Sequence, residues 1–359
     1  MLRDMSKTVW ICVALLFTIG TAGWIYIASD SNTTDTCTAE KYQTDCFIQK
    51  VEQFTKTGDI NGALAYAIEI IAPESRNSLH MSMHVIGRAA YLTSRSRDSA
   101  MAILPNDAFT DDGHLIYDGF QHGVLQALFV EKGENTSVHT LIKESCGSYW
   151  IEENNPRGPS PQRTGLGCFH GVGHALMALY KNDVEKSVEV CTTLPYAWMQ
   201  ERCGYGVFME ASYAFYPSYT EHAMHAEHNT SESSMKNVCI NASALKEVCA
   251  LFVGHSYLMS HANNYAGAFS TCKEMSEDLA TECDIYLAEV IFPGMTHDTE
   301  KLISACATAG SSQERCLLWV AHGLHNGYGG PEGRKIDFCA VVPKDVTKKC
   351  ENFLSASTT

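Results

Sequence analysis

The sequence lacks the signatures of several common protein classes. Its 359 residues contain no run of basic residues and carry a net charge of −15. Because phosphate binding needs clustered lysine and arginine, we expect no nucleic-acid partner. The chain has no glycine-rich phosphate loop after a strand pattern, no Gly-x-Ser-x-Gly nucleophile elbow and no Cys-x-x-Cys-His haem attachment motif. Alternating strand patterns are nearly absent, which predicts an all-α fold.

One apolar run, Val9 to Ile27, is long enough to cross a bilayer. Arg3 and Lys7 precede it, and Asp30 and Asp35 follow it. Since the positively charged flank stays in the cytoplasm, the rest of the chain is expected on the other side. A cleaved signal peptide is the competing interpretation, with Ala28-Ser29 as a weak cleavage site.

The anchor interpretation divides the chain into four parts. We expect a single-pass membrane protein whose large C-terminal domain is extracytoplasmic. The parts are a cytoplasmic tail (1–8), a transmembrane anchor (9–27), a linker (28–36) and a helical-repeat domain (37–359).

Cysteine content agrees with an oxidising compartment. The chain has 15 cysteines, and Cys12 lies inside the apolar run, so the other 14 could form seven disulfides. The chain also has sequons that would allow glycosylation, at Asn32, Asn135, Asn229 and Asn241.

The spacing of the cysteines is regular. Most of them fall into pairs with 8 to 11 residues between the partners: Cys37–Cys46, Cys191–Cys203, Cys239–Cys249, Cys272–Cys283, Cys306–Cys316 and Cys339–Cys350. Cys146 and Cys168 form a similar neighbouring pair with a longer segment between them. Connectivity cannot be proven from sequence, but nearest-neighbour pairing is the choice that repeats with the predicted helices.

The repeat itself is predicted to be a pair of helices. The second cysteines Cys249, Cys283, Cys316 and Cys350 are 34, 33 and 34 residues apart, the period of paired-helix repeats. Asp59 is a predicted N-cap for a helix over Ile60 to Ile71. Two inserts, Glu152–Gly165 and Pro217–Lys236, are predicted to be loops. Each disulfide would join the second helix of one repeat to the first helix of the next.

In period and cysteine placement, residues 37–350 resemble tetratricopeptide-like helical repeats, in particular the secreted, cysteine-rich branch. The large–small residue pattern of that family is kept loosely, as in Gly171 to Tyr180. The resemblance implies an α-solenoid of paired helices, stapled by disulfides, whose concave face binds a protein or peptide partner. Recurrent histidines are not part of the family's pattern.

Histidine nevertheless recurs at one position of the repeat. Five cysteines, Cys168, Cys203, Cys249, Cys283 and Cys316, each open a predicted helix, and a polar or sulfur-containing residue follows six positions later. Two upstream segments fit the same frame without the cysteine. We call this position the histidine column; it comprises His84, His122, His174, Met209, His255, Glu289 and His322.

In three of these helices another ligand type stands four residues earlier. The pairs are His80 with His84, Asp118 with His122, and His170 with His174. Residues four apart share one face of a helix, so both side chains of a pair can reach one metal ion. Nearby glycines indicate close helix packing or space for a ligand.

Imidazole and carboxylate groups suit Zn, Fe, Mn or Cu. The predicted metal ligands are His80, His84, Asp118, His122, His170, His174, His255, Glu289 and His322. The competing interpretation is structural: the column is a hydrogen-bond ladder between repeats. A further trio in a loop, His222, His225 and His228, is more simply a solvated segment.

The sequence supports two hypotheses about function. The first is a membrane-anchored metalloprotein, with Asp118 or Glu210 as the general base if the protein is an enzyme. The second is a non-enzymatic repeat scaffold that binds a partner and uses the histidines structurally. They differ in whether the paired ligands meet within coordination distance.

Overall fold

The structure, a computed structural model, describes residues 37, 43–72, 76–104, 114–147, 163–213, 238–239, 245–261, 264–328 and 333–357. The chain forms two compact units, Met1–Cys46 and Phe47–Thr359. The described part of the first unit contains the Cys37–Cys46 disulfide. All regular secondary structure in the described ranges is helical, which confirms the all-α class predicted from the missing strand patterns.

Long helices alternate with short ones along most of the chain. The long helices are α2 (Gln43–Lys56), α5 (Arg76–Ser94), α7 (His114–Lys132), α9 (Arg163–Leu179), α11 (Ala197–Tyr213), α14 (Lys246–Ser260), α16 (Glu277–Tyr286), α19 (Gln313–Asn326) and α22 (Lys344–Ser357). The short helices are α3 (Ile60–Tyr66), α6 (Arg97–Met101), α8 (Val138–Cys146), α10 (Val184–Thr192), α15 (Tyr265–Lys273), α18 (Thr299–Ala307) and α21 (Phe338–Val341).

Two elements are extended by a π-helical turn. The segment η3 (Ala67–Ile71) continues α3, and η6 (Leu287–Ile291) joins α16 to α17 (Phe292–Met295). A 3₁₀ turn, η7 (Gly310–Ser312), precedes α19. A π turn inserts an extra residue into the helix and shifts the register of the residues after it.

Side-chain caps fix where several short helices begin. Asp59 accepts a hydrogen bond of 2.8 Å from the backbone N–H of Gly62 at the start of α3, so the predicted cap is confirmed. Asp183 caps α10 in the same way, and Asn264 caps α15. Asp59 and Asp183 each come directly after a tight turn, so the local sequence sets these two boundaries.

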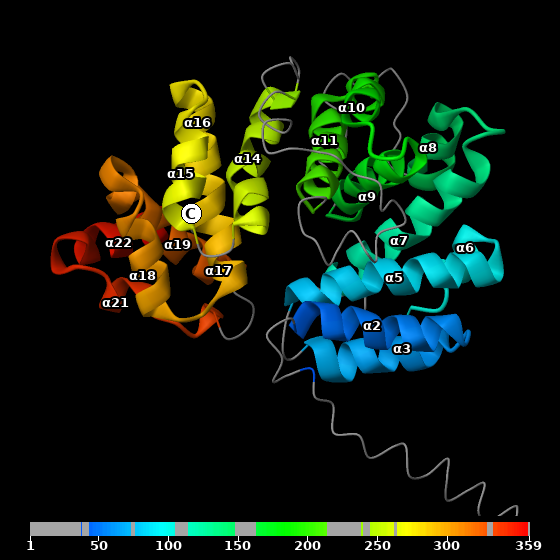
Figure 1. Cartoon of the computed structure of the whole chain (residues 1–359), viewed down its shortest axis with the longest axis horizontal. Helices are drawn as coiled ribbons and strands as arrows, with labels where there is room; N and C mark the ends of the chain where they lie inside the picture. Colours follow the sequence, from blue (N-terminus) through cyan, green and yellow to red (C-terminus); the bar gives the residue numbers. More distant parts are fainter. Residues whose placement is uncertain are drawn as a thin grey trace, which may run out of the picture. The chain divides into compact units, whose positions relative to one another are not determined.

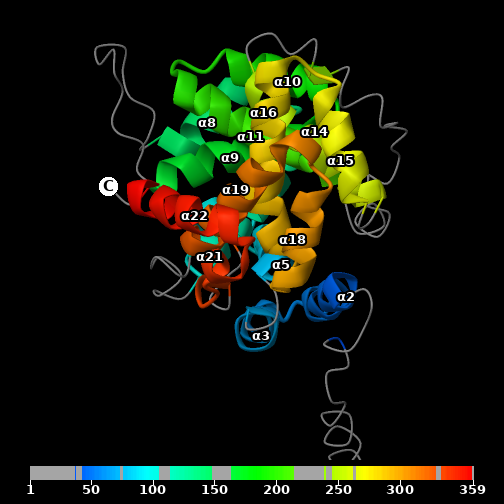
Figure 2. The same ribbon diagram turned by 90° about the vertical axis from the view of Figure 1, so that its left-hand side faces the viewer.

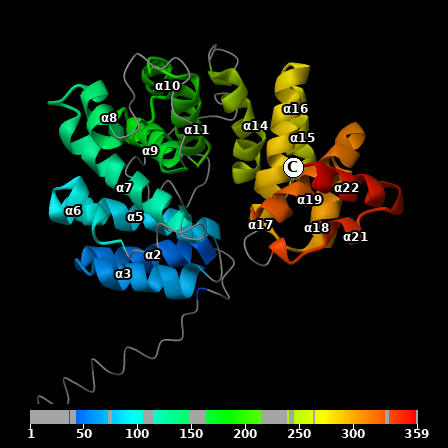
Figure 3. The same ribbon diagram turned by 180° about the vertical axis from the view of Figure 1, so that it is seen from behind.

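Successive long helices pack on one another within the second unit. Figures 1 and 3 show α5, α7, α9 and α11 in chain order, from cyan to green, and each contacts the next. The series continues through α14 and α16 with η6 to α19 and α22, and Figure 2 shows α22 beside α19 near the C-terminal end. Their facing sides are apolar, with Phe120, Phe169, Phe208 and Phe252 fully buried.

Seven cysteine pairs lie at disulfide bonding distance, with sulfur–sulfur distances from 1.92 to 2.05 Å. The pairs are Cys37–Cys46, Cys146–Cys168, Cys191–Cys203, Cys239–Cys249, Cys272–Cys283, Cys306–Cys316 and Cys339–Cys350. Five of them link the end of a short helix to the first two turns of the next long helix. These are the partners that the spacing indicated.

Helix starts differ from the sequence expectation by a few residues. The long helices begin three to six residues before the cysteines expected to open them; α9, for example, begins at Arg163 rather than at Cys168. The predicted loop Glu152–Gly165 therefore ends too late, since its last three residues are helical. The cysteines lie inside the helices because a disulfide to the preceding helix needs a position that faces it.

The membrane prediction concerns residues that the structure does not describe. Within the described ranges, no helix is both long and apolar enough to cross a bilayer. The predicted tail, anchor and linker (1–36) lie outside those ranges, as do Asn32, Asn229, Asn241 and the loop histidines His222, His225 and His228. Asn135 is described, and it is exposed in the turn that follows α7.

Candidate metal centre

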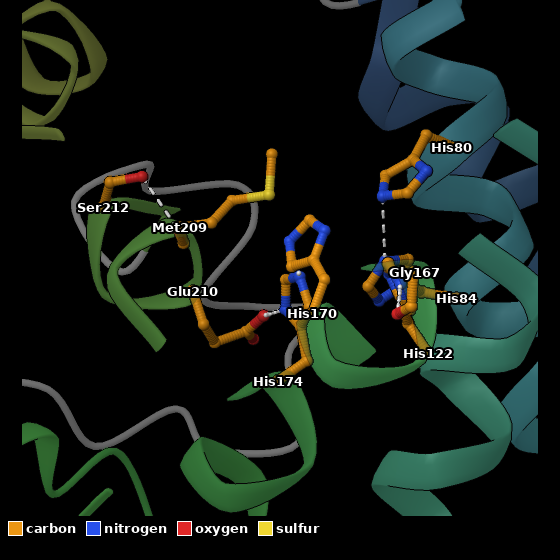
Figure 4. Close-up of polar contacts among 9 residues, drawn as sticks. All are labelled: His80, His84, His122, Gly167, His170, His174, Met209, Glu210 and Ser212. Carbon is orange, nitrogen blue, oxygen red and sulfur yellow. Dashed lines mark hydrogen bonds and ion pairs between the residues drawn. The ribbon is translucent and has the colours of Figure 1, made fainter. Parts of the chain in front are cut away.

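Three successive long helices bring five imidazoles into one cluster, which we call the imidazole cluster. Its members are His80 and His84 on α5, His122 on α7, and His170 and His174 on α9. Figure 4 shows these side chains as sticks. Centroids of the contacting rings lie 4.7 to 5.4 Å apart. His84 and His174 also touch, with centroids 4.9 Å apart, although α7 lies between their helices in the chain.

Ring nitrogens of the cluster face one another. Nε2 of His84 is 3.2 Å from Nε2 of His80 and 3.3 Å from Nδ1 of His122. Nε2 of His174 is 3.1 Å from Nε2 of His170. Ligand nitrogens on a tetrahedral ion with bonds of about 2.0–2.1 Å are about 3.3 Å apart. The spacing of these nitrogens therefore matches a metal coordination shell.

A backbone carbonyl fixes the tautomer of His122. Nε2 of His122 is 3.2 Å from the carbonyl oxygen of Gly167, in the first turn of α9. A carbonyl oxygen only accepts, so Nε2 carries the hydrogen and Nδ1 of the neutral ring keeps its lone pair. That lone pair points toward His84, on the inside of the cluster.

A carboxylate fixes the tautomer of His174. Nδ1 of His174 donates to Oε2 of Glu210 on α11 over 2.6 Å, and both side chains are almost completely buried. Nε2 of His174 is then the nitrogen with a lone pair, and it faces His170. Histidines that bind metals usually donate their other N–H to a carboxylate or a backbone carbonyl, as His174 and His122 do.

Two-centre hydrogen bonds alone do not satisfy both contacts of His84. Its Nε2 carries either one hydrogen or one lone pair. With a lone pair it can accept from His80, but it then faces the lone pair of His122 at 3.3 Å. With a hydrogen it can donate to His122, but it then has no lone pair for His80 at 3.2 Å. A cation between the three nitrogens would satisfy all of them, which argues against a simple hydrogen-bond ladder.

Burial keeps the rings of His84, His122 and His170 neutral. His122 is 0 % exposed and His84 is 7 % exposed. Burial lowers the pKa of His84 and of His122 well below the ordinary histidine value, and the neighbouring imidazoles lower it further. The pKa of His170 is lowered in the same way. At neutral pH these three side chains therefore offer lone pairs rather than charges.

Glycines allow the helices to come this close. A Cβ atom on Gly123 would collide with the backbone of His84 and Arg88, and one on Gly87 would collide with the carbonyl oxygen of Phe120. At Gly171, a Cβ atom would lie 2.7 Å from Cδ2 of His122. Of the two purposes expected for the glycines beside the ligands, the structure shows close packing, both of α5 on α7 and of α9 against the ring of His122.

Other predicted ligands lie apart from the cluster. The carboxylate of Asp118 is packed against Gly167, and it belongs to neither group of potential ligands in the described residues. Nδ1 of His255 lies 3.2 Å from Oγ of Ser212, and Nδ1 of His322 donates to Glu289 over 2.7 Å. The structure does not bring His255, Glu289 or His322 into either of these groups.

Sequence reasoning named Glu210 only as a possible base and missed its contact with His174. In α11 the residue at the column position is Met209, yet the side chain that is hydrogen-bonded to the cluster is that of the next residue. The signal available in the sequence was a lone acidic residue beside the column in an otherwise apolar stretch. The role of the Gly167 carbonyl has no sequence signal, because every residue has one.

Comparison with known proteins adds no relative: the chain matches no protein-family model, no curated protein and no solved structure. The function is therefore inferred from the geometry of the imidazole cluster.

Proposed function

We propose that this chain is a metalloprotein that binds a transition-metal ion in the imidazole cluster. The observation that carries the proposal is the facing arrangement of His80, His84 and His122, whose nitrogens are spaced as in a coordination shell. Neutral imidazoles in a buried site suit Zn, Cu or Fe. Three protein ligands leave a fourth tetrahedral position open for water or another ligand, which is the arrangement of catalytic metal sites.

The hydrogen bonds made by the outer ring nitrogens of the histidines support the same proposal. The Gly167 carbonyl orients His122, and Glu210 orients His174, so two rings are held with a lone pair directed into the cluster. Such outer contacts stabilise the correct tautomer and raise the basicity of a ligand. Because Glu210 contacts the cluster through His174, it would act in a catalytic site as a positioning residue for that ring.

The proposal includes the wider architecture. We infer a disulfide-stapled α-solenoid, held at a membrane by residues 9–27, with the metal centre on the extracytoplasmic side. The seven disulfides support an oxidising location. Labelling of cysteine-free reporter tags at residue 1 and residue 359 in intact cells tests the topology; labelling of the N-terminal tag alone would contradict it.

Elemental analysis of the untagged full-length chain tests metal binding. We expect at least about one equivalent of a transition metal in the purified protein. His122→Ala should contain less of it, and His84→Ala provides a second variant in case the first does not fold. His322→Ala is the matched control, because His322 has the same position in the repeat and a carboxylate partner but lies outside the cluster.

Two results would contradict the proposal. One is a folded wild-type chain, with all seven disulfides, that neither contains a metal nor takes one up. The other is equal metal content in His122→Ala and the wild type. Either result would favour the hydrogen-bond ladder and a scaffold that binds a protein or peptide.

A further inference from the structure

Potential ligand atoms of the cluster fall into two groups of three. One group is His80, His84 and His122; the other is His122, His170 and His174. Within each group the ligand atoms lie within 4.8 Å of one another. Two ligands on opposite sides of one ion, with bonds of about 2.1 Å, are at most about 4.2 Å apart. The five side chains do not form a single group even at the wider limit, so one ion cannot bind all five in this arrangement.

We propose that the cluster holds two copper ions, one in each group. This inference rests on the proposed metal-binding function and adds the number and the kind of ions. His122 belongs to both groups and lies between them, with its ring stacked on His174 at a centroid distance of 5.0 Å. Ions in neighbouring groups of this size would be separated by about 3.5–4 Å, as in known two-metal sites.

The two positions are not equivalent. The lone pair of His122 lies on Nδ1, 3.3 Å from Nε2 of His84, so His122 serves the first group. The first ion then has three imidazole ligands. The second has His170 and His174, with Glu210 behind His174, and keeps more open positions. We therefore expect the first ion to bind more tightly and the second to be the more accessible to an added ligand.

Charge favours copper over the other candidates. The five ligand side chains are imidazoles, and the carboxylate of Glu210 is hydrogen-bonded to one of them. Burying two dications near one carboxylate is costly, whereas two Cu(I) ions bring half the charge. Imidazole is a good copper ligand, and among divalent ions copper has the highest affinity for such sites.

Titration of the metal-free full-length protein with Cu(I) under anaerobic conditions, against a competing chelator, measures the number of sites. We expect two equivalents in the wild type and in the His322→Ala control. His80→Ala and His170→Ala should each lose one equivalent. These variants remove half-buried members of each group, so both are expected to fold. His84→Ala and His174→Ala repeat the test with the buried partner of each pair.

Other outcomes separate this inference from the proposed function. A single equivalent in the wild type, lost in both His80→Ala and His170→Ala, would overturn the pair of ions and leave the metalloprotein proposal intact. Uptake of zinc with no uptake of copper would overturn the choice of metal in the same way. No uptake of either metal would overturn both proposals.

Electron paramagnetic resonance of the Cu(II)-loaded protein gives an independent readout. Two Cu(II) ions about 4 Å apart interact magnetically, so the signal of isolated copper should be weak in the wild type. His170→Ala should restore that signal, because a single ion remains in the first group. A full isolated-copper signal from wild-type protein loaded with two equivalents would contradict adjacent sites.

Discussion

The N-terminal long helices α5, α7 and α9 and the later elements α14, η6 and α19 have polar residues at the same repeat position, but the surroundings of these side chains differ. In the first region five imidazoles from three helices touch one another. In the second, Glu289 and His322 form a pair with side chains 18 % and 16 % exposed, and His255 contacts Ser212. The same register thus produces a cluster in one region and separate pairs in the other.

Close approach of the helices occurs in both regions and does not by itself explain the difference. Gly87 and Gly123 bring the backbones of α5 and α7 into direct contact, and Gly173 and Gly206 do so for α9 and α11. In the later region Gly254 faces the side chain of Leu287, but Gly323 on α19 is in equally close contact with the backbone of Glu289 on η6. The two regions differ instead in the residue four positions before the column, which is a histidine on α5 and α9 and an apolar residue on α14, α16 and α19. A shared repeat position therefore forms a common site where nearby helices supply more than one imidazole each.

The largest difference between the regions should come from their disulfides. Cys168 follows Gly167, whose carbonyl holds His122, so Cys146→Ser/Cys168→Ser should loosen that contact. The chain-entropy model gives a loss of about 3.5 kcal/mol in unfolding free energy, and metal affinity should fall about 10- to 100-fold. Cys306→Ser/Cys316→Ser should cost about 2.7 kcal/mol and leave metal affinity unchanged. Equal metal affinity in the two double variants would contradict the coupling.

A pH titration of stability isolates a buried histidine outside the cluster. Burial lowers the pKa of His255 from 6.5 to about 4. The unfolded chain therefore binds a proton before the folded one does, so stability is full above pH 6.5 and falls as the pH decreases toward 4. His255 should account for a loss of up to about 3 kcal/mol.

Chemical unfolding of the wild type and of His255→Gln between pH 4 and 7 measures this loss. The pKa values of His84, His122 and His170 are lowered too, so the metal-free wild type loses stability in the same direction from several groups. The informative quantity is the difference between the two curves. A constant difference across the range would show that His255 titrates alike in the folded and unfolded chains.

Two carboxylates test the outer contacts of the two regions. Glu210→Gln keeps the size of the side chain but weakens the hydrogen bond that orients His174, so metal affinity should fall about 10- to 100-fold. Glu289→Gln makes the matching change beside His322 and should leave affinity unchanged. Competition with a chelator of known affinity measures both. Equal effects would remove the distinction between the regions.

The smallest effect is expected where α11 meets α16. The hydroxyl of Tyr205 donates to that of Tyr286 over 2.8 Å, and the ring of Tyr205 contacts His170 with centroids 5.2 Å apart. Tyr205→Phe keeps the ring and removes the hydrogen bond, which should cost about 1 kcal/mol and leave metal content unchanged. A double-mutant cycle with Tyr286→Phe measures the coupling energy. A coupling near zero would show that the hydroxyl pair does not stabilise the junction.

Much of the local structure can be predicted directly from the sequence. Asp59 predicted the start of α3, and the spacing of the cysteines indicated the partners that lie at bonding distance. The four-residue spacing of His80 and His84, and of His170 and His174, placed each pair on one helix face. These features depend on caps, turns and helix period, which act over a few residues.

Less of the candidate metal site could be predicted from the sequence. Asp118 has the spacing of a ligand but packs against Gly167, and Glu289 lies in a π turn and pairs only with His322 among the column residues. Glu210 reaches His174 although its neighbour Met209 has the column position. Such details depend on the rotation and separation of packed helices, and one residue of shift turns a side chain by about 100°.

The sequence by itself determined the all-α class, the repeat with its cysteine spacing, and the set of histidines from which a site could be built, because helix period and turn chemistry are local. Tertiary structure decided which histidines meet. Close backbone contact at Gly87 and Gly123 brought α5 and α7 together, Gly171 left room for His122 against α9, and burial there removed the water that would otherwise hydrogen-bond each imidazole separately. The later column residues have the same register, but no histidine stands four residues before them, and His322 pairs with Glu289 rather than with another imidazole.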